Sequence, residues 1–175
     1  MRYLFVLFVI ASCQASPVKG EPIVVGCSLI PPLDTACFAI INDSVAAANT
    51  VAFAKTFLGT PYKFGCSAPS TGFDCSGFIS YVLHHSGIEA PRSSIDFTNA
   101  GATIPLDNAR VGDLILFTGT NSAIRTVGHI GLVVAVGIGG LRFIHASSGS
   151  DYAVIITLLN EGYKQRFVKI VRMKK

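Results

Sequence analysis

The sequence predicts an α+β domain in which N-terminal helices pack on a central antiparallel β-sheet. Apolar residues between positions 44 and 86 recur at the three- and four-residue spacing of amphipathic helices. The second half changes to short β-branched and apolar runs separated by Gly, Asn, Ser or Asp, which is typical of strands. Half of the 175 residues are hydrophobic and only 14% are charged, so the chain can bury a sizeable core. Helices that precede a run of strands favour the α+β class.

Three helices are expected in the first half of the chain. The first covers residues 44–59, with Ser44 as its N-cap and a glycine at its end. The second covers residues 75–86, and Gly87 stops its apolar stripe. A short third helix is expected after Pro91, where either of two serines can cap it.

Five strands are expected in the second half, each bounded by turn residues. The segment Gly137-Ile138-Gly139-Gly140 predicts a hairpin loop between two of them. Strands joined by such short loops run antiparallel, which predicts an antiparallel sheet. The expected strands cover residues 114–117, 129–136, 141–146, 154–158 and 166–171.

Residues 1–12 predict a signal peptide of the lipoprotein type. A basic start precedes a run of seven apolar residues, Leu4 to Ile10, and then small residues. Seven residues are far fewer than the ~20 that cross a bilayer as a helix. The segment Ile10-Ala11-Ser12-Cys13 resembles a bacterial lipobox, which implies lipid attachment to Cys13 at the cell envelope. Gln14 favours the outer membrane, facing the periplasm, if the source has two membranes. An ordinary signal peptide cleaved nearby is the alternative.

Residues 13–43 are expected to form a tether and lead-in segment, because Pro, Gly and Asn interrupt every apolar period. Residues 44–175 then form the folded domain. Cys27 and Cys37 lie in the lead-in and Cys66 in the domain, and an exported protein can pair such cysteines. Three cysteines are an odd number, so at least one of them stays free or pairs between chains. The sequence leaves the pairing open.

Cys75, His129 and His145 are the candidate catalytic residues. Cys75 begins the second helix, where unpaired N–H groups and the helix dipole lower the pKa of a thiol. His129 starts one expected strand, and His145 lies opposite residues 131–133 on the next strand across the hairpin. Side chains two residues apart share a face of a sheet, so both imidazoles can point to one side, and we expect them to face the thiol at the helix start. A thiol, a base and a group that orients the base are the parts of a cysteine nucleophile.

Six blocks of sequence, which include the three candidate residues, occur in a characteristic order. They are Gly59-Thr60-Pro61-Tyr62-Lys63-Phe64-Gly65, Gly72-Phe73-Asp74-Cys75-Ser76-Gly77-Phe78, Pro91-Arg92-Ser93-Ser94, Gly112-Asp113-Leu114, Gly128-His129-Ile130-Gly131-Leu132 and Phe143-Ile144-His145-Ala146-Ser147-Ser148. With these blocks the chain resembles the NlpC-type cysteine peptidases, a papain-like α+β family that hydrolyses peptide bonds in bacterial cell-wall stem peptides. The resemblance covers residues 44–172 and implies that Cys75 is the nucleophile, His129 the general base and His145 its orienting partner.

The resemblance also implies roles for residues near the thiol. Tyr62 matches a tyrosine whose hydroxyl lies near the nucleophile and helps to hold the oxyanion. Asp74 and Ser76 match positions on the substrate side, where a carboxylate can meet a free peptide amine, and Arg92 matches a loop arginine. The chain departs from the family at Phe64-Gly65-Cys66, where the family usually has Trp-Gly-Gly.

The implied substrate is the peptidoglycan stem peptide, cleaved at the D-γ-glutamyl–diamino acid bond without a cofactor or a metal. We expect a monomer, and the scattered Lys and Arg residues argue against a nucleic-acid partner. Alternatives are an amidase or acyltransferase on the same fold, and an inactive lipoprotein that binds peptidoglycan. A zinc site is disfavoured because its potential ligands lack the short paired spacings of structural zinc sites; these ligands would be Cys66, Cys75, His129 and His145.

Overall fold

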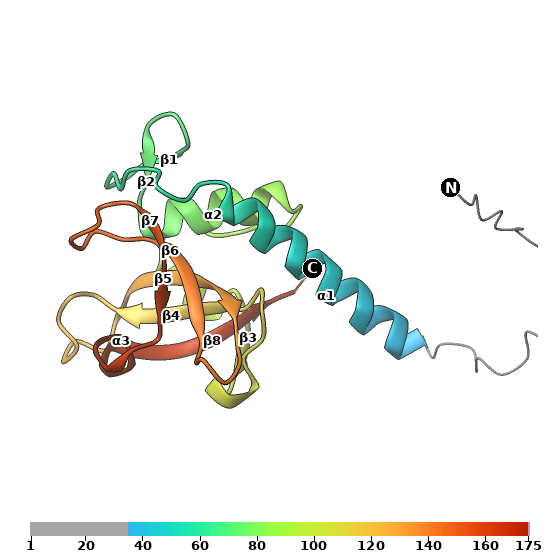
Figure 1. Ribbon diagram of the computed structural model, residues 1–175. Helices are drawn as coiled ribbons and strands as arrows, with labels where there is room; N and C mark the ends of the chain where they lie inside the picture. The colour runs from blue at the N-terminus through green and yellow to red at the C-terminus, as the bar shows by residue number, and fades with distance from the viewer. Residues whose placement is uncertain (1–34, 175) are drawn as a thin grey trace, which may run out of the picture. The chain divides into compact units, whose positions relative to one another are not determined.

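The computed structural model describes residues 35–174, with side chains from residue 43 onward. Two α-helices, α1 (Thr35–Lys55) and α2 (Cys75–His85), precede most of the strands, and a short helix, α3 (Glu161–Arg166), follows them (Figure 1). Two 3₁₀ turns connect the halves, η1 (Asp96–Asn99) and η2 (Leu106–Asn108). The strands are β1 (Ser67–Ala68), β2 (Gly72–Phe73), β3 (Gly101–Ile104), β4 (Leu114–Thr118), β5 (Val127–Ala135), β6 (Arg142–Ala146), β7 (Val154–Leu158) and β8 (Phe167–Met173).

Six of the strands form one antiparallel sheet in the order β3-β8-β4-β5-β6-β7, and β1 pairs with β2 separately. The central strand β4 is buried along its whole length, because helices or loops cover both of its faces. This arrangement confirms the predicted α+β class, with N-terminal helices on a central antiparallel sheet.

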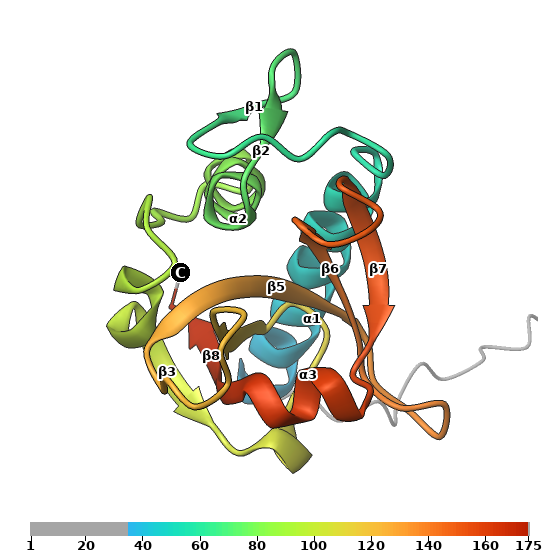
Figure 2. The same ribbon diagram turned by 90° about the vertical axis from the view of Figure 1, so that its left-hand side faces the viewer.

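Each face of the sheet has its own apolar core. On one face α1 and α2 pack against β5 and β6 around buried residues such as Phe78, Val82 and Leu132. On the other face Phe117, Phe143 and their neighbours form a second cluster. Figure 2 shows α2 end-on above β5 and α3 on the opposite side of the sheet. Successive side chains of each strand point alternately into these two clusters, so the position of a residue in its strand determines which face its side chain occupies.

The first helix begins earlier than predicted. α1 starts at Thr35 and not at Ser44, so nine residues of the expected lead-in are helical. No Gly or Pro occurs between Pro32 and Gly59, so the chain lacks a residue that would stop the helix at position 44. Cys13 and Cys27 lie outside the described residues, as does the side chain of Cys37.

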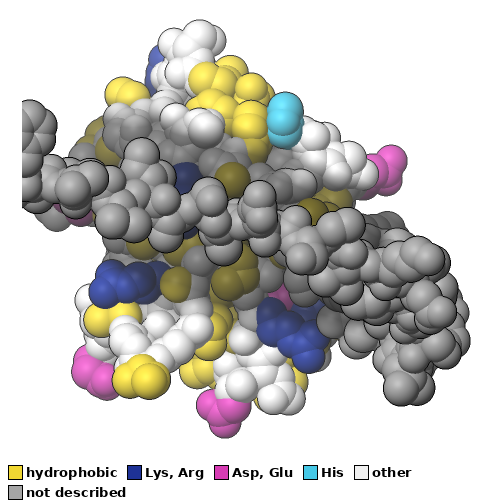
Figure 3. All heavy atoms as spheres, turned by 45° about the vertical axis from the view of Figure 1, so that its right-hand side comes forward, with side chains coloured by type: hydrophobic (Ala, Val, Ile, Leu, Met, Phe, Trp, Pro, Cys, Tyr) yellow, Lys and Arg dark blue, Asp and Glu magenta, His cyan; other side chains and the backbone are white. Residues whose placement is uncertain are grey.

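Other differences concern short elements. The chain after Pro91 forms the 3₁₀ turn η1 in place of an α-helix, because it must reach β3 within a few residues. α3 was not predicted, although Asn160 caps it by accepting a hydrogen bond from the Tyr163 N–H at 3.1 Å. No helix among residues 35–174 is long and apolar enough to cross a membrane. On the face seen in Figure 3 the visible Lys and Arg side chains form separate groups with neutral side chains between them.

Candidate active site

Cys75 is the first residue of α2, and Asp74 is the N-cap of this helix. The Asp74 carboxylate accepts a hydrogen bond from the Gly77 N–H at 2.6 Å. A Cβ on Gly77 would collide with the carbonyl oxygen of Cys66, so only glycine allows the loop to lie against the first turn. The sulfur of Cys75 therefore sits at the positive end of a fixed helix, half-buried and as a free thiol.

The two histidines meet where β5 and β6 separate. Leu132 is paired with Ile144, and the paired register of the two strands ends there. His129 and His145 lie beyond this pair, and Nε2 of His129 is 2.8 Å from Nδ1 of His145 in a hydrogen bond. By extension of the register, His145 lies opposite residue 131. The predicted placement of the two imidazoles on one side of neighbouring strands is confirmed.

The histidines share the sheet face that is turned away from α2. Their rings contact Phe117, Phe143 and Tyr163, which line the second core cluster. The sequence reasoning had the thiol and the rings facing each other across one side of the sheet, and this detail was wrong, because α2 packs on the other face. Beyond the pair Leu132–Ile144 the two strands are no longer paired, which leaves an opening between them.

The sulfur of Cys75 meets β5 at this opening. The backbone N–H of Ile130, the residue next to His129, lowers the pKa of the thiol, which places it near the sulfur. This N–H is free to do so because β6 no longer pairs with β5 at this level. The structure contains no hydrogen bond between the sulfur and either imidazole among the described residues, and such bonds in enzymes often shorten only when substrate binds.

Burial keeps the thiol and both imidazoles neutral. It raises the pKa of Cys75, with a further rise from the Asp74 carboxylate, and the backbone N–H groups at the helix start only partly oppose this. The helix terminus alone was expected to lower this pKa, so the net direction was wrong. Burial also holds the pKa of His129 well below its usual range, helped by His145 and Arg166. The pKa of His145 falls to about 4 through burial and the charge of Arg166.

Asp74 joins three segments around the thiol. Its carboxylate accepts hydrogen bonds from Gly65 N–H at 2.9 Å and from both terminal nitrogens of Arg92, at 2.7 and 3.0 Å. Arg92 also donates to Ser76 Oγ at 3.2 Å. Asp74 is only 6% exposed, so an incoming peptide amine would have to displace a protein donor to bind its carboxylate. The part of this cluster that faces solvent is the half-exposed guanidinium of Arg92.

Tyr62 lies near the thiol. Burial raises the pKa of its hydroxyl, and the charges of Cys75 and Asp74 raise it further, which places this hydroxyl near both. Sequence reasoning missed its neighbour Tyr152, whose ring packs edge-on to Tyr62 with centroids 5.2 Å apart. Tyr152 has φ of 48°, a left-handed conformation that is costly for an aromatic residue. No pattern in the sequence predicted this conformation.

A second residue missed from the sequence is Thr157 on β7. Its Oγ1 lies 2.9 Å from Nε2 of His145, on the side of the ring opposite His129. The available indication was a single polar residue within an otherwise apolar strand, Val154-Ile155-Ile156-Thr157-Leu158. Among the described residues no cluster of three or more His, Cys, Asp or Glu side chains is placed to hold a metal ion.

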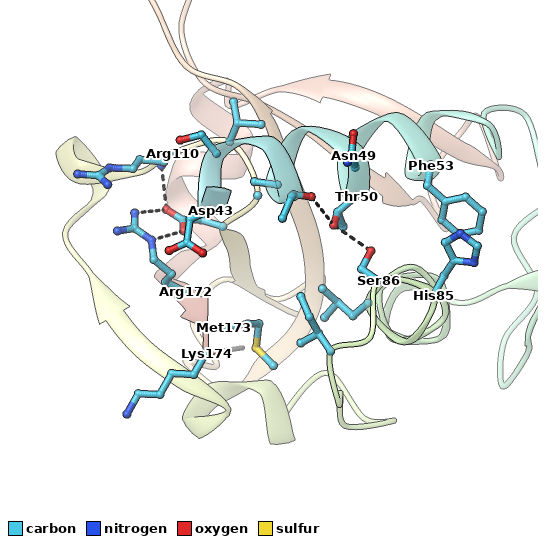
Figure 4. A pocket seen from close by; sticks show the side chains of 18 residues that line it. Asp43, Asn49, Thr50, Phe53, His85, Ser86, Arg110, Arg172, Met173 and Lys174 are labelled. Atoms are coloured by element: carbon cyan, nitrogen blue, oxygen red, sulfur yellow. Dashed lines mark hydrogen bonds and ion pairs between the residues drawn. The ribbon is translucent and has the colours of Figure 1, made fainter. Parts of the chain in front are cut away.

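A groove of about 960 Å³ lies elsewhere in the described domain, between α1, the end of α2 and the end of β8. Figure 4 shows Asp43, Thr50, Ser86 and Arg172 around it. None of the predicted site residues lines it, and Cys75 is at the other end of α2.

Comparison with known proteins agrees with this geometry. The model of the NlpC/P60 family matches residues 59–173. The chain is 36% identical over 123 residues to the gamma-DL-glutamyl hydrolase of Bacillus subtilis (strain 168), covering 70% of this chain and 28% of that protein. It is 37% identical over 111 residues to the murein DD-endopeptidase MepS/murein LD-carboxypeptidase of Escherichia coli (strain K12), covering 62% and 53%. The chain thus spans from about a quarter to about half of the length of these relatives.

Solved structures show the same fold. An NlpC/P60 family protein from Bacillus cereus ATCC 10987 superposes with a TM-score of 0.63 at 30% identity, over 72% of this chain and 39% of that one. NlpC2 from Trichomonas vaginalis gives a TM-score of 0.63 at 30% identity, over 73% and 46%. The chain therefore belongs to the NlpC/P60 family and has its papain-like α+β fold.

Proposed function

We propose that this protein is a cysteine peptidase that hydrolyses peptide bonds in peptidoglycan stem peptides. Cys75 is the nucleophile, His129 the general base, and His145 the group that orients His129. The observation that carries the proposal is the opening between β5 and β6, where a helix-tip sulfur and a hydrogen-bonded pair of imidazoles meet the same few residues of β5. The relatives named above are hydrolases of glutamyl or murein bonds, which supports this substrate class.

The ring nitrogens of His129 have separate tasks in this mechanism. Nε2 is engaged with His145, so Nδ1 is the nitrogen left to take the proton of the thiol. Because burial leaves both groups neutral, the proton moves from sulfur to Nδ1 as the sulfur attacks the amide carbon. The N–H of Cys75 and the hydroxyl of Tyr62 hold the developing oxyanion. His129 then protonates the leaving amine, and water hydrolyses the acyl-enzyme.

The bond that we propose is D-γ-glutamyl–diamino acid. A relative from Bacillus subtilis (strain 168), 33% identical over 116 residues, is a gamma-D-glutamyl-L-lysine dipeptidyl-peptidase, which acts on this type of bond. The relative from Escherichia coli is instead a DD-endopeptidase and LD-carboxypeptidase. Export, a lipid on Cys13 and a monomeric state are parts of the same proposal, and residue 13 lies outside the described residues.

The test compares two cysteine variants on defined muropeptides, with products identified by mass spectrometry. Cys75→Ala should lose activity by at least ~1,000-fold, because nucleophile and base act as a unit. Cys66→Ala is the matched control: it removes the other described free thiol and should keep activity within a few-fold. Both variants should retain the circular dichroism of the wild type.

Cleavage by the Cys75→Ala protein would overturn the proposal, as would loss of activity only in the Cys66→Ala protein. Product masses decide between the glutamyl bond and the D,D cross-link. Release of ammonia, or transfer of the acyl group to an added amine, would point to an amidase or an acyltransferase. Binding of muropeptides without turnover by wild-type protein would point to an inactive peptidoglycan-binding protein.

A further inference from the structure

His145 is held between two partners inside the domain. Its Nδ1 faces Nε2 of His129 at 2.8 Å, and its Nε2 faces Oγ1 of Thr157 at 2.9 Å. The ring is fully buried, so neither nitrogen can turn to water for a replacement partner. The three side chains, from β5, β6 and β7, form a continuous chain of hydrogen bonds that leads away from Cys75.

The position of each proton in this chain follows from the chemistry. A base at Nδ1 of His129 requires its resting proton to be on Nε2, where it is donated to His145 Nδ1. His145 must then carry its own proton on Nε2, and Thr157 Oγ1 must accept it. When His129 has taken the thiol proton, both of its nitrogens are donors, so this polarity is the only one that leaves no donor facing a donor.

We propose that Thr157 is a positioning residue: by accepting the Nε2 proton of His145 it selects the tautomers of both histidines and leaves His129 Nδ1 free to act as the base. The inference rests on the proposed function and extends it by one residue. The positive charge of Arg166 lowers the pKa of both histidines, so each ring at rest carries a single proton. The position of that proton on His145 then depends on the acceptor that Thr157 provides. A neutral His145 with a fixed tautomer therefore has to transmit the orientation to His129.

Thr157→Val is the informative variant, because valine has the shape of threonine without the hydroxyl and favours strands. It leaves a buried N–H on His145 without an acceptor, which costs enough to favour the other tautomer. His145 would then donate from Nδ1 to His129 Nε2, and the proton of His129 would move to Nδ1, where it blocks the base. Thr157→Ser keeps the acceptor and should keep the wild-type tautomers.

The experiment uses ¹⁵N NMR of the histidine rings together with steady-state kinetics on muropeptides. In wild type and Thr157→Ser both rings should carry the proton on Nε2, and in Thr157→Val both should carry it on Nδ1. We expect kcat of Thr157→Val to fall ~10- to 100-fold with KM unchanged, and kcat of Thr157→Ser to stay within about 3-fold. Thr50→Val is the matched control, since it removes another buried threonine hydroxyl, bonded to Ser86 Oγ at 2.9 Å and remote from the histidines.

The outcomes separate the two proposals. Wild-type protein that cleaves no stem peptide but shows the tautomer change in Thr157→Val would refute the function and leave the positioning role intact. An active wild type whose Thr157→Val variant keeps full kcat, or the wild-type tautomers, would refute the positioning role alone. An equal loss of kcat in Thr50→Val would also refute it, because the effect would then be a general loss of stability.

Discussion

Replacing Asp74 with asparagine should destabilise the domain and, at the same time, make the thiol of Cys75 more acidic. Asparagine can still cap α2 by accepting from Gly77, so the helix start is preserved. Its amide nitrogen replaces Oδ2 and cannot accept from the Gly65 N–H or from Nη2 of Arg92, so those two hydrogen bonds are lost, while the bond from Nη1 of Arg92 to Oδ1 can remain.

The magnitude follows from the contacts. The bond from Gly65 contributes about 1 kcal/mol, and the Arg92 pair about 1 kcal/mol because that side chain is 47% exposed and screened by water. Asp74→Asn should therefore lower the free energy of unfolding by about 2 kcal/mol, or the melting temperature by ~5–10 °C. The negative charge of Asp74 helps to raise the pKa of Cys75, so its removal should lower that pKa.

Asp113→Asn is the matched control. Asp113 is equally buried and is bonded in the same way, to Arg172 at 2.7 and 2.8 Å and to the N–H of Arg110 at 2.8 Å, but it is remote from the thiol. The Asp113→Asn variant should lose a similar free energy of unfolding without a change in the pKa of Cys75. Urea denaturation measures the first effect, and the pH dependence of iodoacetamide alkylation of Cys75 measures the second. The reasoning is wrong if the alkylation midpoint of Asp74→Asn stays or rises, or if Asp113→Asn shifts it equally.

Two further predictions concern pH and packing. The depressed pKa of His145 means that the unfolded state binds its proton between about pH 4 and 6.5 while the folded state does not, so its contribution to stability is complete above pH 6.5 and is lost as pH falls. From pH 7 to pH 5 the wild type should lose about 2 kcal/mol more than His145→Asn in urea denaturation, and equal losses would contradict the buried neutral ring. Gly131→Ala should cost about 1–3 kcal/mol, since its Cβ would lie 2.6 Å from a phenylalanine ring on β6. Gly137 has open space around it, so Gly137→Ala should change stability by less than about 0.5 kcal/mol. A comparable loss of stability in the two variants would show that the phenylalanine ring near Gly131 moves aside.

The sequence was informative where the determinants are local. The apolar stripe that ends at Gly87 predicted a helix over residues 75–86 with Cys75 at its start, and the structure confirms the helix and the place of Cys75. The glycines between 137 and 140 centred the hairpin, which placed His145 opposite residue 131 and brought it beside His129. The start of α1 was missed because a capping residue such as Ser44 also occurs inside helices, and nothing there ends the preceding run.

Properties that depend on distant contacts could not be predicted in this way. The direction of the Cys75 pKa reflects how deeply the sulfur is buried against β5, and this outweighs the helix terminus. The conformation of Tyr152 and its contact with Tyr62 depend on the loop between β6 and β7, whose backbone lies against residues 61–62. Both properties depend on contacts with several residues that are distant in the sequence.

By itself, then, the amino-acid sequence determined the α+β class, the family resemblance and the residue types of the site, because helix caps, turn glycines and strand alternation act over a few residues. Only the tertiary structure decided which face of the sheet the imidazoles occupy, that Asp74 is tied to Arg92, and that Thr157 follows His145 in a chain of hydrogen bonds. The physical reason is that alternation along a strand is local: it fixes which side chains of that strand share a face. The curvature of the sheet and the separation of β5 from β6 depend on distant contacts, and they determine which of those side chains lie near a helix on the other face.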